Sequence, residues 1–144
     1  MKKLITLVVV LAALSTAAHA ADAYNGFKFT AEETQICEQS VNRTVISQLR
    51  NQFDESMVAV LSAPLLRNTK KACYDAFYNF AAGKNSVSDA DLVAASNKLK
   101  DTAAAGEKKP SDDAIMNTAE DFIRFQSMNI YKTVYDLKNR GQIK

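Results

Sequence analysis

The sequence predicts an all-α protein, a compact bundle of four to five helices with one disulfide. Apolar residues recur at steps of three and four in several segments, which is the spacing of one helical face. No segment alternates apolar and polar residues for long enough to predict a strand. The chain has two cysteines behind an export signal, and such a pair is typical of a disulfide.

The first twenty residues are predicted to be a cleaved signal peptide. Lys2 and Lys3 precede an apolar run over 4–14, and Ala18-His19-Ala20 supplies the small residues of a cleavage site. The run is shorter than the ~20 residues that a spanning helix needs. We therefore expect residues 21–144 to form a single domain. Because the Lys-Lys start is typical of bacteria, we expect it to work in the periplasm or in the medium.

Cleavage also changes the charge of the chain. The full sequence has 18 basic and 16 acidic residues, and the loss of two lysines leaves equal numbers. This balance argues against nucleic acid as a partner, because such binders carry a basic excess. The mature chain has no further apolar run long enough to span a bilayer, so the sequence predicts no stable membrane insertion.

The mature chain begins with an arm over 21–29 that has no helical period. Thr30 and Glu33 then form a capping box, which predicts the start of the first helix. The apolar pattern continues at helical spacing to Phe53. The acidic stretch 54–56 is expected to interrupt this helix.

The middle of the chain predicts two shorter helical segments. An apolar run covers 57–61, and Pro64 is expected to break it or to start a new helix, because proline lacks the N–H that a helix interior needs. The next pattern covers 65–80, and Gly83 is the expected C-terminal cap.

Two helices are predicted in the last third of the sequence. Ser88 caps the first, whose thin inner stripe is Leu92, Ala95, Leu99 and Ala103. The stretch 106–110 is the clearest loop of the chain. Ser111, Asp112 and Asp113 then cap a long helix over about 112–139, which ends near Gly141.

Cys37 and Cys73 are expected to form a structural disulfide between the first and third predicted helices. Both lie on predicted inner faces, and two cysteines allow only one pairing. Two buried free thiols are the main alternative. A redox pair is expected as Cys-x-x-Cys, and zinc needs four N/S ligands, whereas the mature chain offers two sulfurs and no histidine.

The residues needed for common enzyme chemistry are missing. Without His19, the mature chain has no histidine for a catalytic triad, a haem or a zinc site. No phosphate-binding glycine loop and no calcium loop is present. The sequence therefore predicts that the protein is not an enzyme and that it binds neither a cofactor nor a metal.

A carboxylate-based hydrolase is the weaker alternative, since two suitably spaced acids suffice for glycoside hydrolysis. The adjacent acid pairs are Asp54-Glu55, Asp112-Asp113 and Glu120-Asp121. We interpret the first two as helix-end residues, and we expect Glu120 to pair with Arg124 four residues later.

Three groups of residues are candidates for a partner surface. Tyrosines form two i, i+4 pairs, the arm carries three aromatic residues, and three cations lie close together. The alternatives are that the tyrosines line the edge of the core, that the arm packs back onto the bundle, and that the cations face a nearby acidic loop. The candidates are Tyr131, Tyr135, Tyr74, Tyr78, Tyr24, Phe27, Phe29, Arg67, Lys70 and Lys71.

These observations predict an exported, non-enzymatic protein that binds another envelope or secreted protein, as an inhibitor, immunity factor or chaperone does. A second copy of the chain is also a candidate partner. The alternative is a periplasmic binder of a small apolar ligand, held between helices by methionine and phenylalanine side chains. The residues expected to line such a site are Met57, Met116, Met128, Phe122 and Phe125.

Overall fold

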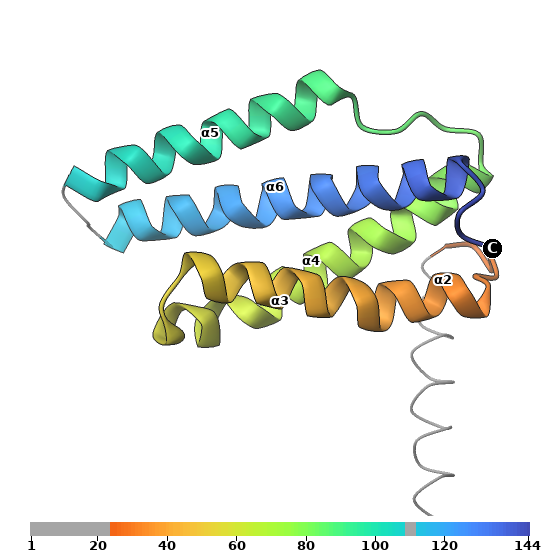
Figure 1. The fold of residues 1–144 in the computed structure, drawn as a ribbon, viewed down its shortest axis with the longest axis horizontal. Coiled ribbons are helices and arrows are strands. Elements are labelled where there is room, and N and C mark those ends of the chain that lie inside the picture. The colour runs from red at the N-terminus through yellow and green to blue at the C-terminus, as the bar shows by residue number, and fades with distance from the viewer. Residues whose placement is uncertain (1–23, 109–111) are drawn as a thin grey trace, which may run out of the picture.

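The protein is described from a computed structural model that covers residues 24–108 and 112–144. Within these residues it is a bundle of four helices without strands, which confirms the predicted fold class. The first helix is continuous and has three parts, α2 (Ala31–Gln35), the π-helical η1 (Ile36–Ser40) and α3 (Val41–Gln52). It is followed by α4 (Glu55–Ala81), α5 (Asp89–Lys108) and α6 (Asp112–Asn139), as Figure 1 shows.

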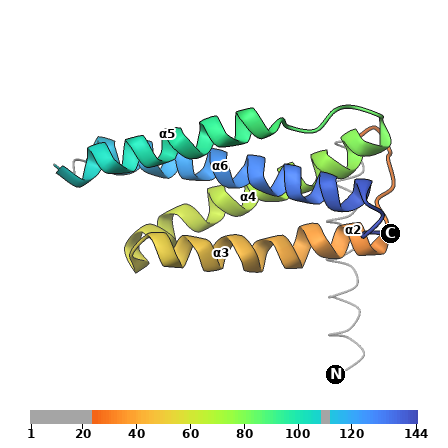
Figure 2. The same cartoon turned by 45° about the horizontal axis from the view of Figure 1, so that its top comes forward.

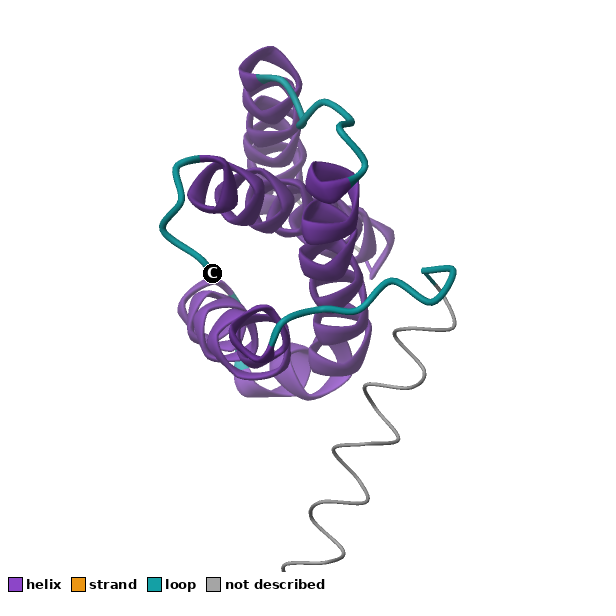
Figure 3. Ribbon diagram, turned by 90° about the vertical axis from the view of Figure 1, so that its right-hand side faces the viewer, coloured by secondary structure: helices purple, strands orange, loops and turns teal. Residues whose placement is uncertain are grey.

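The first helix and α4 form an antiparallel hairpin, and α6 packs against α4 (Figure 1). The remaining helix, α5, packs mainly on α6 and lies on the side away from the first helix (Figures 2 and 3). The predicted signal peptide, residues 21–23 of the arm and residues 109–111 lie outside the described residues. No described helix is long and apolar enough to cross a membrane.

The core lies between the first helix, α4 and α6. Its largest fully buried side chains include Leu49, Leu65, Phe77 and Phe122. In contrast, the side chains described for α5, at 89–103, are all partly or fully exposed, including its predicted inner stripe. This helix therefore lies at the margin of the bundle.

The π-helical segment explains an unusual pattern of burial. Every fourth residue of the first helix is buried, namely Glu33, Cys37, Val41, Val45 and Leu49. An α-helix has 3.6 residues per turn, so each four-residue step drifts by about 40° around the axis. A π-turn contains more residues per turn and reduces this drift. As a result, both ends of the helix present the same row of side chains to the core.

The break expected at Pro64 does not occur. Segments 57–61 and 65–80 belong to one helix of 27 residues, with Pro64 in its interior. The helix begins where the sequence predicts an interruption, because Asp54 caps it by accepting a hydrogen bond from the backbone N–H of Met57 at 3.0 Å. Leu61, Leu65 and Thr69 continue one buried row past the proline, so core packing maintains the helix there.

The other predicted boundaries were mostly correct. Ser88 caps α5, since its Oγ accepts from the N–H of Asp91 at 3.1 Å. Gly83 ends α4 with φ = 73° and donates to the carbonyl of Phe80 at 3.1 Å. The loop expected at 106–110 was wrong in part, because α5 continues to Lys108.

The C-terminal residues close the bundle against α2. Ile143 is buried, and the backbone N–H of Lys144 donates to Glu32 Oε2 at 2.9 Å. The buried Glu33 accepts from the Thr30 N–H at 2.8 Å, which completes the predicted capping box, and its second oxygen lies 3.3 Å from Lys138 Nζ. One carboxylate thus joins the start of the first helix to the end of α6.

Candidate functional site

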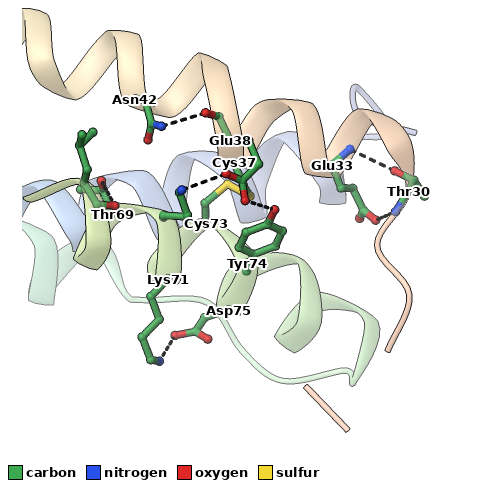
Figure 4. Close-up of a disulfide and its surroundings, with 12 residues drawn as sticks. Thr30, Glu33, Cys37, Glu38, Asn42, Thr69, Lys71, Cys73, Tyr74 and Asp75 are labelled. Atoms are coloured by element: carbon green, nitrogen blue, oxygen red, sulfur yellow. Dashed lines mark hydrogen bonds and ion pairs between the residues drawn. A yellow bond between two sulfur atoms is a disulfide. The ribbon is translucent and has the colours of Figure 1, made fainter. Parts of the chain in front are cut away.

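Cys37 of η1 and Cys73 of α4 form the predicted disulfide (Figure 4). Both residues are fully buried, and their Cα atoms are 5.5 Å apart. Because 57–61 and 65–80 are one helix, the bond joins the first helix to the second rather than to a third. It fastens the hairpin at the end where the arm enters.

An acidic residue beside the disulfide compensates one of the predicted cations. Glu38 lies 2.9 Å from Lys70 Nζ through one oxygen and accepts from the Tyr74 hydroxyl at 2.7 Å through the other (Figure 4). Lys71 pairs with Asp75 at 2.6 Å. The predicted helix over 65–80 would place Arg67, Lys70 and Lys71 near its start; this placement is wrong, because α4 begins at residue 55 and the three cations lie in its middle.

The aromatic arm packs back onto α4. Asn25 and Gly26 both have positive φ, and the Phe27 N–H donates to the Tyr24 carbonyl at 3.0 Å, which makes a tight Asn-Gly turn. This turn gathers five rings, whose centroids in contact lie between 4.7 and 6.4 Å apart. The rings are those of Tyr24, Phe27, Phe29, Tyr74 and Tyr78.

Two of the three tyrosine hydroxyls of this cluster, those of Tyr24 and Tyr74, donate to other residues of the molecule. Tyr24 donates to Asp75 Oδ1 at 2.6 Å. Tyr74 is 4 % exposed, so its ring does not offer contact area to a partner, contrary to its place among the candidates. Burial, and then the hydrogen bonds to Asp75 and Glu38 respectively, raise the pKa of Tyr24 and of Tyr74 well above the usual value of 10.

These raised pKa values predict a loss of stability in alkali. Below pH 10 both phenols are neutral in the folded and unfolded chain, and their contribution to stability is complete. Above pH 10 only the unfolded chain ionises them, so the free energy of unfolding falls by up to about 1.4 kcal/mol per pH unit for each phenol. Urea unfolding between pH 9 and 11 should show a shallower fall in Tyr24→Phe/Tyr74→Phe. An unchanged slope would contradict this assignment.

The other tyrosine pair lies near the C-terminal ends of α4 and α6. Tyr131 accepts from Asn79 Nδ2 at 2.9 Å, and Tyr135 donates to the Lys84 carbonyl at 2.6 Å. Their rings stack on each other, and Phe80 meets Tyr135 edge to face. Both are partly exposed, so they remain candidates for contact, but their polar ends tie α6 to the end of α4.

In the acid pairs whose side chains the structure describes, Asp54 and Asp121 have structural roles. Asp54 is a helix cap, and its bonds to the Met57 N–H and to the Ser56 hydroxyl lower its pKa. Asp121 is buried, accepts from Thr102 Oγ1 at 2.7 Å and lies 3.5 Å from Lys98 Nζ. The expected Glu120–Arg124 pair is not formed. The side chains of Asp112 and Asp113 lie outside the described part.

The residues expected to hold an apolar ligand are spread over different environments. Phe122 is a core residue beside Phe53, and Met116 is 48 % exposed. Met128 lines an open groove of about 380 Å³ between α5 and α6. That groove also carries Asp91, Lys98, Asp121 and Arg124, a set of charges that does not suit an apolar ligand.

The first half of α4 has an outer face that nothing in the described structure covers. The arm covers the outer side of the second half through Tyr78, whereas the first half presents small apolar side chains and ends at a cation. Val60 is 62 % exposed, which is the highest value among the large hydrophobic residues described. This surface, here called the α4 face, consists of Ala59, Val60, Ala63, Pro64 and Arg67.

A groove adjoins the α4 face at the bend between α3 and α4. Its volume is about 520 Å³, and it is lined by Phe53, Val58 and Ala59 with Arg50 and Glu55. The side chains of Arg50 and Glu55 make no ion pair or hydrogen bond within residues 24–108 and 112–144. The same holds for the side chain of Arg67. The apolar groove and face therefore have charges at their edges that are available to a partner.

Pro64 adds a polar feature to this face. Proline has no N–H, so the carbonyl of Val60, four residues earlier, lacks its usual helical donor. Apolar side chains and an open backbone acceptor thus occur together on an exposed face of α4. Such a combination is unfavourable for an isolated helix and suits a contact surface.

Sequence reasoning missed the α4 face, because the apolar run 57–61 has the composition of a core segment. A proline inside a helical pattern, which leaves the carbonyl four residues earlier without a donor, was the signal that could have indicated this face. Comparison with protein-family models, with curated protein sequences and with solved structures found no match to this chain. Among the residues that the structure describes, no group of three or more potential metal ligands occurs.

Proposed function

We propose that this chain is an exported, non-enzymatic binding protein that acts on another protein of the periplasm or the medium through the α4 face. The observation that carries this proposal is the exposure of Val60 next to a groove, on the same face as the unpaired Arg67. Contact area with adjacent charges is what a protein partner recognises.

The rest of the molecule supports such a role. The disulfide and the aromatic cluster hold the hairpin rigid, and a rigid surface loses less entropy on binding. The disulfide is also consistent with an oxidising compartment, as the predicted signal peptide requires. Asp54, Asp121 and the described tyrosines Tyr24, Tyr74, Tyr131 and Tyr135 make contacts within the molecule, whereas the α4 face has no internal role.

Photo-crosslinking from the α4 face tests this function. A photoreactive amino acid at position 60, in protein exported by its own host, should crosslink to one protein of different mass. The matched control is position 93 on α5, because Val93 is a valine of similar exposure, at 58 %. Equal crosslinking from both positions, or none from position 60, would contradict the proposal.

A point substitution then measures the contribution of the face. Val60→Asp places a charge in the centre of the contact and should weaken binding to the crosslinked partner at least about tenfold, or 1.4 kcal/mol. Val93→Asp should leave the affinity unchanged. Both positions are exposed, so circular dichroism should show folded protein in each case.

A further inference from the structure

We propose that the α4 face also binds a second copy of the same chain, with the two α4 helices antiparallel in a symmetric dimer. This inference uses the same surface as the proposed function but does not depend on it. It rests on the order of residues along the first half of α4, which is acidic at its start (Glu55), small and apolar in its middle, and basic at its end (Arg67).

The two charged ends are placed for mutual pairing. The apolar part of the face, from Ala59 to Pro64, is centred between residues 61 and 62. Glu55 lies about 10 Å from this centre along the axis and Arg67 about 8 Å on the other side, at 1.5 Å per residue. A twofold axis through the centre therefore brings Glu55 of each copy close to Arg67 of the other. Such an isologous contact forms every pair twice.

The middle of the face suits the close approach of two helices. Ala59 and Ala63 are one helical turn apart and both exposed, and small side chains allow two helices to pack with little separation. Val60, the most exposed of the large apolar residues described, would be covered by the corresponding part of the second copy. No bulky side chain on the face prevents this approach.

The groove provides a place for the incoming arginine. It begins beside Ala59, and Phe53 and Val58 form apolar walls that suit the stem of an arginine side chain. Glu55 on one edge attracts the guanidinium, whereas Arg50 on the α3 side repels it. The cation is therefore directed to the Glu55 side, as the antiparallel arrangement requires.

One helix face is small compared with the interfaces of permanent dimers. We therefore expect a weak, reversible dimer, and another protein that uses the α4 face must compete with it. Dimerisation would keep the apolar face covered when no other partner is present.

Sedimentation equilibrium of the purified mature chain tests the dimer without any other protein. We expect a concentration-dependent monomer–dimer equilibrium. Glu55→Lys and Arg67→Glu should each weaken it at least about tenfold, because each variant alone places like charges opposite each other twice. Glu120→Lys and Lys100→Glu, exposed reversals elsewhere, should leave it unchanged.

Mixing the Glu55→Lys and Arg67→Glu variants provides the decisive measurement. In a mixed dimer, the lysine introduced at position 55 of one copy faces the glutamate introduced at position 67 of the other. At the second site, the native Glu55 and Arg67 face each other. The mixture should therefore dimerise about as well as wild type, and native mass spectrometry should show the heterodimer.

Each other outcome of these measurements overturns a separate part of the proposal. A monomer at all concentrations, or variants that dimerise like wild type, would overturn the dimer and leave the crosslinking test of the other partner unaffected. A mixture that stays monomeric would overturn the antiparallel register.

Discussion

Replacing Cys37 and Cys73 together by serine is expected to lower the free energy of unfolding by about 4 kcal/mol. The bond closes a segment with a sequence separation of 36 residues, and the loop-entropy relation gives this value for a loop of that length. In a chain of about 120 residues, the length expected after removal of the predicted signal peptide, such a loss lowers the melting temperature by about 12 to 20 °C. Thermal unfolding followed by circular dichroism measures it.

Wild-type protein unfolded in the presence of a reductant is the matched control, and it should have the same melting temperature as the double variant. Helical content below the transition should stay the same, because the caps at Thr30, Asp54 and Ser88 do not depend on the bond. If the double variant and the oxidised wild type have the same melting temperature, and the wild-type sample is shown to contain no free thiol, the expected contribution of the disulfide to stability is contradicted.

Most of the fold could be predicted because the signals are local. Thr30 and Glu33 satisfy each other's backbone N–H groups within one turn, so the start of the first helix is encoded in four residues. Gly83 ends α4 for an equally local reason, since a positive φ favours glycine. The disulfide followed from the number of cysteines and from the predicted compartment.

The errors arose where packing overrides local preference. Pro64 and Gly106 are both unfavourable inside helices, and both lie inside one. At Pro64 the reason is visible, because Leu61 and Leu65 extend the same buried row on either side of it. The spacing of four that runs from Glu33 to Leu49 was present in the sequence, but its meaning as a π-turn depends on which residues are buried.

The candidate site was less predictable than the fold, because residue type does not reveal exposure. Tyrosine is suited to binding surfaces, yet Tyr74 is buried and Tyr24 uses its hydroxyl inside the molecule. Valine and alanine are suited to cores, yet Val60 and its neighbours are exposed, since α4 is packed on its other sides. Only the tertiary arrangement separates the two cases.

Pro64→Ala is expected to raise the free energy of unfolding by about 2 to 3 kcal/mol, the opposite sign from most substitutions. A proline in a helix interior costs about 3 kcal/mol relative to alanine, because it removes one hydrogen bond and its ring meets the preceding turn. Alanine restores the N–H that the Val60 carbonyl lacks. Pro64→Gly also restores this N–H, but it should gain about 1 kcal/mol less, because glycine is a poorer helix former. Urea unfolding of the three proteins gives the series.

The same variants test why an unfavourable proline lies on the exposed face of α4. If the open carbonyl of Val60 accepts a hydrogen bond from a partner or from the second copy, Pro64→Ala will be more stable and will bind more weakly, because its own N–H occupies that acceptor. Stability and binding that rise together would mean that the α4 face works through its side chains alone. A variant less stable than wild type would contradict the expected gain and show that contacts of the half-buried proline ring outweigh the missing hydrogen bond.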